Sequence, residues 1–249
     1  MRHAEGGPVR LIWAQPDPPP RRQVLGREPI VTAAIGLADE AGPDALTMQA
    51  VAARLGSYSA MALYRYVHSK DGLVDLMLDG VAGEIPVPDG PGADWRADLY
   101  ELAVATRRMI QRHPWFAALY HTRPPAGPHL MRRLEFMLTV LVARGATAAE
   151  AMTFAALLDR HVVGSALQEA EEARMSRRLG LDDEGALRAA LAAVRGLAEG
   201  RFPILASWLA RPSGAAPGEQ FELGLRFLLD GIAGELAARP PGPAPLPQR

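Results

Sequence analysis

Apolar residues recur at helical spacing along most of this chain, and the strict apolar–polar alternation that is typical of β-strands is nearly absent. Capping residues and Gly/Pro breakers divide the first third into short segments. Helices are predicted from about Arg27 to the breaker Gly42-Pro43, from Met48 to Leu55, from Ser59 to His68 and from Ser69 onward. The pattern therefore predicts an all-α fold that begins with a group of short helices.

Longer helical patterns follow residues 86–92, a stretch with three prolines and two glycines that is the best candidate for a domain boundary. Thr147 and Glu150 form a T-x-x-E capping box, which marks the start of a long helix. The predicted helices run from Asp94 to His113-Pro114, from about His129 to Gly145, from Thr147 to about Leu179 and from Phe221 to Leu236.

These boundaries divide the chain into a small helical domain at residues 27–85 and a larger one at residues 93–238. An arm at residues 1–26 and a tail at residues 239–249 are rich in proline, and we expect both to be disordered. Residues 180–201 are poor in large apolar side chains, which predicts a mobile connection inside the larger domain.

The composition excludes several classes of protein. The absence of cysteine excludes disulfides, thiolate metal sites and cysteine nucleophiles. No apolar run reaches the roughly 18–20 residues of a membrane span, and the N-terminus lacks the apolar segment of a secretion signal. We therefore expect a soluble, cytoplasmic protein with no membrane partner.

Charge becomes informative only locally, because the net charge of the whole chain is −1. No Asp or Glu occurs between Ala45 and Lys70, a window that also contains Arg54 and Arg65. Residues 1–27 hold five arginines against two acidic residues. These two basic stretches have two interpretations. They can arise by chance, or they can mark the one part of the protein that binds phosphate groups.

Three short helices followed by a fourth, with Gly56 at the second turn, are typical of a helix-turn-helix unit. Ala52, Leu55, Leu63 and Val67 would form its small core. The third helix of such a unit lies in the major groove of DNA, where its exposed side chains meet bases and phosphates. The sequence thus favours a DNA-binding function.

Three runs in this unit make the indication more specific: LTMQAVAARLG (residues 46–56), ALYRYV (62–67) and SKDGLVDLM (69–77). They resemble the tetracycline-repressor family, whose hallmark across these helices is A-x-x-L-G … L-Y-x-[HY]-[FV]-x-x-K-x-x-L. Three later segments are similar to the C-terminal domain of the tetracycline-repressor branch, namely HTRP (121–124), GSALQE (164–169) and FELGLRFLLDG (221–231).

The resemblance implies a homodimer that binds a palindromic operator in double-stranded DNA. Tyr64 and Lys70 would contact phosphate, Thr47 would cap the second helix and touch the DNA backbone, and Gln49 would reach a base. Arg65 is the expected guanine reader. The full set of expected DNA contacts is Thr47, Gln49, Ser59, Ala60, Met61, Ala62, Tyr64, Arg65, Tyr66 and Lys70.

Several of these residues have a second interpretation. Tyr64 and Tyr66 would also suit the core of a three-helix unit, and Arg54 fits a solvated helix-end charge better than a DNA contact. The turn between Gly56 and Leu63 is one residue longer than the common family turn, so the register of Tyr58 to Met61 stays open. The arm is either inert or places Arg21, Arg22 and Arg27 in the adjacent minor groove.

The resemblance also implies that the larger domain binds a small-molecule effector in a cavity between helices and dimerises through its last long helices. The alternative is that these helices are internal core. Tetracycline repressors hold a magnesium-bound drug with a His and a Glu whose matching positions here are Leu119 and Gln168. We therefore expect an effector other than metal-bound tetracycline, with no metal and no cofactor. The expected pocket residues are Trp115, Leu119, His121, Arg123, Met137, Met152, Phe154 and Gln168.

An enzyme is the competing class, but no G-x-S-x-G, H-E-x-x-H or phosphate-binding glycine loop is present. His113, His121 and His129 form the one histidine cluster worth testing as a metal site, although the prolines around them place them near loops. The run Asp159-Arg160-His161 interrupts an apolar helix and either packs within the fold or serves the effector or the dimer.

The favoured interpretation is a ligand-responsive transcriptional regulator of the repressor type that is not an enzyme. The alternative is an all-α ligand-binding or interaction module without sequence-specific DNA binding.

Overall fold

A computed structural model of the chain describes residues 25–56, 58–120, 126–180, 192, 194, 201–211 and 216–238. The regular structure in these residues is helical throughout, which confirms the predicted all-α fold. The chain forms two compact units, Met1–Ala155 and Ala156–Arg249. Of the predicted arm, the structure describes only the buried Leu25 and Gly26, which precede the first helix, and the predicted tail lies outside the described residues.

The first unit begins with the short helices that the sequence predicts. They are α1 (Arg27–Ala41), the 3-10 turn η2 (Pro43–Ala45), α2 (Met48–Arg54), α3 (Ala60–Val67) and α4 (Lys70–Ala82). Gly56 follows α2 with a φ of 88°, a left-handed conformation that glycine adopts without steric cost. The helix-turn-helix order expected from the sequence is therefore present.

A compact core joins these helices. Ile30 of α1, Leu63 and Val67 of α3, and Met77 of α4 are all completely buried. Full burial of such side chains contributes about 1.5–3 kcal/mol each. The predicted core residues Ala52, Leu63 and Val67 are buried, whereas Leu55 is only half-buried at the end of α2.

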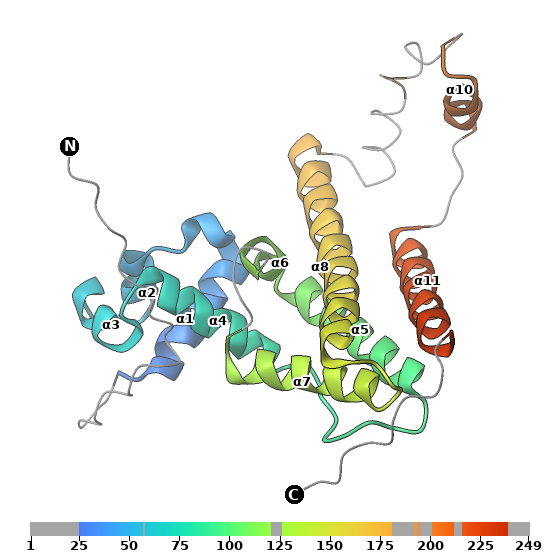
Figure 1. The fold of residues 1–249 in the computed structure, drawn as a ribbon. Helices are drawn as coiled ribbons and strands as arrows, with labels where there is room; N and C mark the ends of the chain where they lie inside the picture. Colours follow the sequence, from blue (N-terminus) through green and yellow to red (C-terminus); the bar gives the residue numbers. More distant parts are fainter. Residues whose placement is uncertain are drawn as a thin grey trace, which may run out of the picture. The chain divides into compact units, whose positions relative to one another are not determined.

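Helix α4 is the centre of the first unit (Figure 1). It packs on α1 and α3, and also on α5 (Trp95–Arg112), α6 (Trp115–Tyr120) and α7 (Pro128–Val142). The proline- and glycine-rich residues 86–92 therefore lie inside this unit, and the domain boundary expected there remains a prediction. One helix thus touches both the helix-turn-helix and the helices that follow it.

The ends of α5 follow the predicted signals. Asp94 caps α5 by accepting hydrogen bonds from the backbone N–H groups of Arg96 and Ala97, and the helix ends before His113. Its buried face consists of Leu99, Leu102, Ala103, Thr106, Met109 and Ile110. The sequence pattern did not predict α6, because six residues are too few to show a helical period.

Helix α8 (Ala148–Leu179) starts in the first unit and continues into the second. The predicted capping box is confirmed: the N–H of Thr147 donates to Glu150 Oε2 at 2.9 Å, and the N–H of Glu150 donates to Thr147 Oγ1 at 3.4 Å. The second unit also contains α10 (Pro203–Ala210), which was not predicted, and the predicted terminal helix α11 (Pro217–Ala237).

His161 joins α8 to α11 within the second unit. Its Nε2 donates to the backbone carbonyl of Phe221 at 2.8 Å, and the two rings stack with centroids 5.2 Å apart. Gly224 makes this approach possible, because a Cβ atom at position 224 would overlap with the imidazole. For His161, the structure therefore favours packing within the fold over the other roles considered for Asp159-Arg160-His161.

Candidate nucleic-acid interface

One side of α3 is exposed in the way that a DNA-reading helix requires. Leu63 and Val67 are fully buried against the neighbouring helices, whereas Met61 is 73% exposed and Tyr64 is 37% exposed. Arg65 is also exposed. Residues three and four apart lie on the same face of a helix, so Met61, Tyr64 and Arg65 form one outward stripe.

Side-chain caps fix the start of each helix around this stripe. The hydroxyl of Thr47 accepts from the N–H of Ala50 at 3.1 Å, and that of Ser59 accepts from Ala62 at 3.3 Å. The hydroxyl of Ser69 accepts from Gly72 at 2.8 Å. Each cap satisfies a backbone N–H that the first turn leaves unpaired. The first turns of α2, α3 and α4 are therefore held in fixed positions beside the stripe.

Arg54 differs from the other cations of this region because it is already paired. Its guanidinium donates two hydrogen bonds to the carboxylate of Glu40 on α1, at 2.6 and 2.7 Å. The Arg54 hydrogen bonds hold the pKa of Glu40 below its ordinary value. Gly36 leaves room for the Arg54 side chain across α1. The pairing with Glu40 gives Arg54 a structural role and agrees with the interpretation that Arg54 is not a DNA contact.

Arg65 and Lys70 carry the available positive charge. Both are exposed, and neither forms an ion pair with any side chain in the part of the chain that the structure describes. Lys70 is the first residue of α4, beside backbone N–H groups that attract anions. Since no acidic residue lies between Ala45 and Lys70, the surface around α3 favours phosphate.

Arg27 anchors the far end of α3. Its Nε donates to the backbone carbonyl of Tyr66 at 3.0 Å, and this carbonyl belongs to the last turn of the helix. A cation at this position also complements the negative end of the helix dipole. The contact gives Arg27 a structural role at the end of α3, and the minor-groove role considered for it remains a prediction. Arg21 and Arg22 lie outside the described residues.

The structure brings the expected DNA contacts together on α2, α3 and the start of α4. All are exposed except for Ala60, Ala62 and Tyr66, which are half-buried. Their contact with DNA, and the register of the turn that includes the undescribed Ser57, remain predictions. Sequence reasoning missed the polar junction that lies behind these helices, described next.

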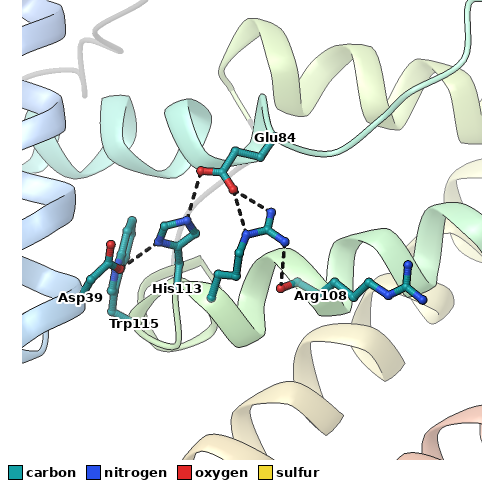
Figure 2. A network of polar contacts seen from close by, with 6 residues as sticks. Asp39, Glu84, Arg108, His113 and Trp115 are labelled. Atoms are coloured by element: carbon teal, nitrogen blue, oxygen red, sulfur yellow. Dashed lines mark hydrogen bonds and ion pairs between the residues drawn. The ribbon is translucent and has the colours of Figure 1, made fainter.

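Figure 2 shows this junction, where α1 meets the turn between α5 and α6. Asp39 Oδ1 lies 2.8 Å from His113 Nδ1 and accepts a hydrogen bond from the indole N–H of Trp115 at 2.6 Å. The other ring nitrogen of His113, Nε2, lies 3.1 Å from Glu84 Oε1. The imidazole therefore stands between two carboxylates.

Glu84, just after α4, also binds Arg112 of α5. The guanidinium donates to Glu84 Oε2 from Nη2 at 2.6 Å and from Nε at 3.1 Å. Burial opposes the ionisation of Glu84, but the Arg112 hydrogen bonds and the neighbouring His113 outweigh it and hold its pKa below the ordinary value. The end of α4 is thereby tied to α5.

Asp79 makes a second connection from α4. Its buried carboxylate accepts hydrogen bonds from the backbone N–H groups of His129 and Leu130 at 2.9 and 3.0 Å, at the N-terminus of α7. Burial raises the pKa of Asp79, although these hydrogen bonds act in the opposite direction. The side chain of one helix thus caps another.

The expected pocket residues are dispersed over several elements. Trp115 and Met137 are buried, Leu119 and Phe154 are half-buried, and Met152 is 48% exposed. Gln168 lies in the second unit and donates to Glu172 at 2.8 Å, whereas His121 and Arg123 lie outside the described residues. Pocket lining therefore remains a prediction for each of them.

The histidine cluster considered as a metal site is only partly described. His113 faces two carboxylates, and the backbone N–H of His129 donates to the carboxylate of Asp79. Within the described residues, no three His, Asp or Glu side chains are grouped as metal ligands, and no helix is long and apolar enough to cross a membrane.

Two family models match the chain. The model described as bacterial regulatory proteins, tetR family, matches residues 30–77, and the model described as tetracyclin repressor-like, C-terminal domain, matches residues 87–236. The HTH-type transcriptional repressor DrrR1 of Streptomyces coeruleorubidus is 36% identical over 236 residues, which cover 93% of this chain and 86% of DrrR1.

Solved structures of ActR, a TetR family protein, are also similar to this chain. Apo ActR from Streptomyces coelicolor superposes with a TM-score of 0.74 at 28% identity, covering 86% of this chain and 97% of ActR. The complex of ActR with actinorhodin superposes with a TM-score of 0.71 at 28% identity, covering 86% of this chain and 99% of that one.

Proposed function

Because this chain belongs to the tetracycline-repressor family of bacterial transcriptional regulators, we propose that α3 reads an operator and that the C-terminal domain binds the effector that ends repression. The chain is a ligand-responsive transcriptional repressor with an all-α fold, and its relatives are regulators, which are not enzymes. Dimerisation and operator binding are typical of the family. A regulator of chromosomal DNA acts in the cytoplasm, which we include in the proposal.

The observation that carries the DNA-reading role is the exposed stripe on α3. A nearly neutral chain, with a net charge of −1, places the exposed Arg65 and Lys70 at and just after α3, and no Asp or Glu occurs from Ala45 to Lys70. Arg65 presents the bidentate donor that recognises guanine in the major groove. Tyr64 and Lys70 donate to phosphate and set the position of the helix on the DNA.

A two-fold dimer supplies the two reading helices that a palindromic site requires. Helix α11 supports this arrangement, since Leu223 and Phe227 are 36% and 66% exposed and lie one turn apart. In the DNA-binding state the two α3 helices would lie about 34 Å apart, in successive major grooves.

We propose an organic effector that is bound without magnesium. Leu119 and Gln168 occupy the positions where the resemblance places the metal-drug ligands of tetracycline repressors, and neither side chain is a strong magnesium ligand. ActR has been solved in complex with actinorhodin and with (S)-DNPA, which supports an effector of similar organic character.

Release from DNA follows from a population shift, with α4 as the element that moves. Helix α4 can transmit a movement from α5–α7 to the DNA-reading helix, because it packs on α3 as well as on α5–α7. An effector that prefers the released arrangement by several kcal/mol would empty the operator.

Selection of DNA sequences from random duplexes by the purified chain tests this function. A palindromic consensus, and an affinity that falls steeply with salt, would support it. Adding actinorhodin or tetracycline with magnesium to the resulting complex then tests the effector. Recovery of random sequences would overturn the operator-binding role, and release by magnesium-tetracycline but not by actinorhodin would overturn the effector class.

A further inference from the structure

The imidazole of His113 has a carboxylate at each of its nitrogens. Asp39 Oδ1 lies 2.8 Å from Nδ1 and Glu84 Oε1 lies 3.1 Å from Nε2, and only 11% of the His113 side chain is exposed (Figure 2). Both distances are within hydrogen-bonding range. The ring is therefore the direct link between the two acidic side chains.

This arrangement favours one protonation state of the ring. A neutral imidazole donates from one nitrogen and presents a lone pair at the other, whereas an imidazolium donates from both. An ionised carboxylate can only accept, so a neutral ring leaves a lone pair facing Asp39 or Glu84. Both contacts are hydrogen bonds only when the ring carries its second proton.

The surrounding groups reinforce this preference. The charged groups that face or adjoin the ring are Asp39 from α1, Glu84 at the end of α4 and Arg112 from α5. The neutral indole of Trp115 on α6 lies edge-on to the imidazole, with the two ring centroids 5.9 Å apart. Two carboxylates and one guanidinium leave one negative charge, which the proton on His113 balances.

The His113 ring lies between the helices of the DNA-reading unit and the helices that follow it, so its proton can affect how the two groups of helices are held together. Asp39 lies on α1 and Glu84 lies just after α4, and both of these helices contact the DNA-reading helix α3. His113, Trp115 and Arg112 belong to α5, α6 and the turn between them. The hydrogen bonds of Asp39 and Glu84 to His113, Trp115 and Arg112 therefore run between the DNA-reading unit and the helices that follow it.

We propose that His113 is a positioning residue whose protonated ring holds α1 and the end of α4 against α5 and α6, and thereby strengthens operator binding. The inference rests on the proposed function, since it concerns the affinity for the operator. When the DNA-reading unit already has a fixed orientation, less conformational entropy is lost as the two copies in a dimer bind the two half-sites of the operator. Loss of the proton turns one hydrogen bond into a repulsion and loosens that orientation.

Three variants test the proposal on the operator recovered by selection, all of them in a His68→Gln background. His68 is exposed at the end of α3, so its own titration would otherwise add to the pH dependence of DNA binding. With His113 intact, we expect the affinity to fall roughly tenfold between about pH 6 and about pH 8. His113→Asn should bind weakly and equally at both pH values.

Glu84→Gln is the decisive variant. Its amide N–H can donate to an unprotonated Nε2 of His113, and its amide oxygen can still accept from Arg112. It should therefore bind tightly at both pH values, which a merely structural role for Glu84 would not produce. A pH dependence that survives in both variants, or an affinity that stays flat or rises with pH when His113 and Glu84 are intact, would overturn the proposal.

A measurement without DNA separates this proposal from the proposed function. The free energy of unfolding of the DNA-free chain should fall over the same pH range, and this fall should be absent in Glu84→Gln. If no sequence is selected, the operator-binding function fails, while the unfolding profile still decides whether the proton holds the junction. If a sequence is selected but its affinity does not follow the profile, only the role of His113 in binding fails.

Discussion

Gly127 leaves open the space that the carboxylate of Asp79 occupies. A Cβ atom at position 127 would overlap with Oδ1, Cγ and Cβ of Asp79, which caps the N-terminus of α7 from the neighbouring α4. The missing side chain of one residue is thus the condition for the buried hydrogen bonds of the other. These contacts fix how α4 meets the effector domain.

Gly127→Ala should therefore displace Asp79 and leave its hydrogen bonds unmade. We expect a loss of about 1–3 kcal/mol in the free energy of unfolding, measured by urea denaturation. Gly90→Ala is the matched control, because nothing lies within 4 Å of a Cβ atom there. Equal stability of the two variants would contradict this account of the Asp79 cap.

Asp79 should also give the stability a characteristic pH dependence. Its pKa is raised above the ordinary value of 3.8, so its contribution is full below that pH and is lost as the pH rises through the raised pKa. In Asp79→Asn the amide oxygen still accepts the two N–H groups but does not titrate. The variant should therefore gain stability relative to the natural chain as the pH rises above about 4 and through the raised pKa of Asp79.

Urea unfolding of both proteins at several pH values measures this difference, since the titrations of all other carboxyl groups cancel. A difference that is constant with pH, or that changes in the opposite direction, would show that burial does not dominate at Asp79.

Arg27 should support α3 without touching DNA. Arg27→Ala removes the hydrogen bond to the carbonyl of Tyr66, and we expect a loss of about 1 kcal/mol in the free energy of unfolding. Amide hydrogen exchange in α3 should become faster, because the last turn frays more easily. Unchanged stability together with a loss of operator affinity would instead favour the minor-groove role.

Gly224 should be required for the contact between α8 and α11. Gly224→Ala forces the imidazole of His161 away from Phe221 and should destabilise the chain by about 1–3 kcal/mol. Gly231→Ala lies in the same helix, has nothing within 4 Å of the added Cβ, and should be neutral or slightly stabilising. Thermal unfolding of the two variants distinguishes these effects.

The sequence predicted those features of the fold that depend on neighbouring residues. The capping box of Thr147 and Glu150 marked the start of α8, and the apolar spacing around Leu63 and Val67 separated the buried side of α3 from the exposed one. Helix α6 was missed because its six residues cover less than two turns. Helix α10 was missed although it is as long as α3, because α3 begins at the capping residue Ser59, whereas Phe202 before α10 makes no side-chain cap.

The polar connections could not be predicted in the same way. Asp39 and His113 are 74 residues apart in sequence, and Asp79 and His129 are 50 residues apart. Local periodicity contains no information about which side chain meets which across such separations. An acidic residue within the apolar run of α4 was the available signal for Asp79, since buried carboxylates require partners.

Arg65 and Lys70 should have different effects on DNA recognition. Arg65→Ala should cost about 1–3 kcal/mol of operator affinity and relax the preference at one base pair. Lys70→Ala should weaken binding about equally on all sequences and reduce its salt dependence. Titrations against operators with single base changes measure both effects, and a uniform loss for Arg65→Ala would reassign it to phosphate contact.

The central claim is that α3 gives this chain sequence-specific binding to DNA. A mobility-shift titration tests it most directly, with the full chain, the selected duplex and the DNA that flanks its own gene, in the presence of unlabelled competitor. The account predicts a discrete complex that survives the competitor and is weakened by Arg65→Ala by the roughly five- to 150-fold that about 1–3 kcal/mol implies. Binding that random-sequence competitor removes completely from both duplexes, with no difference between Arg65→Ala and the natural chain, would contradict it.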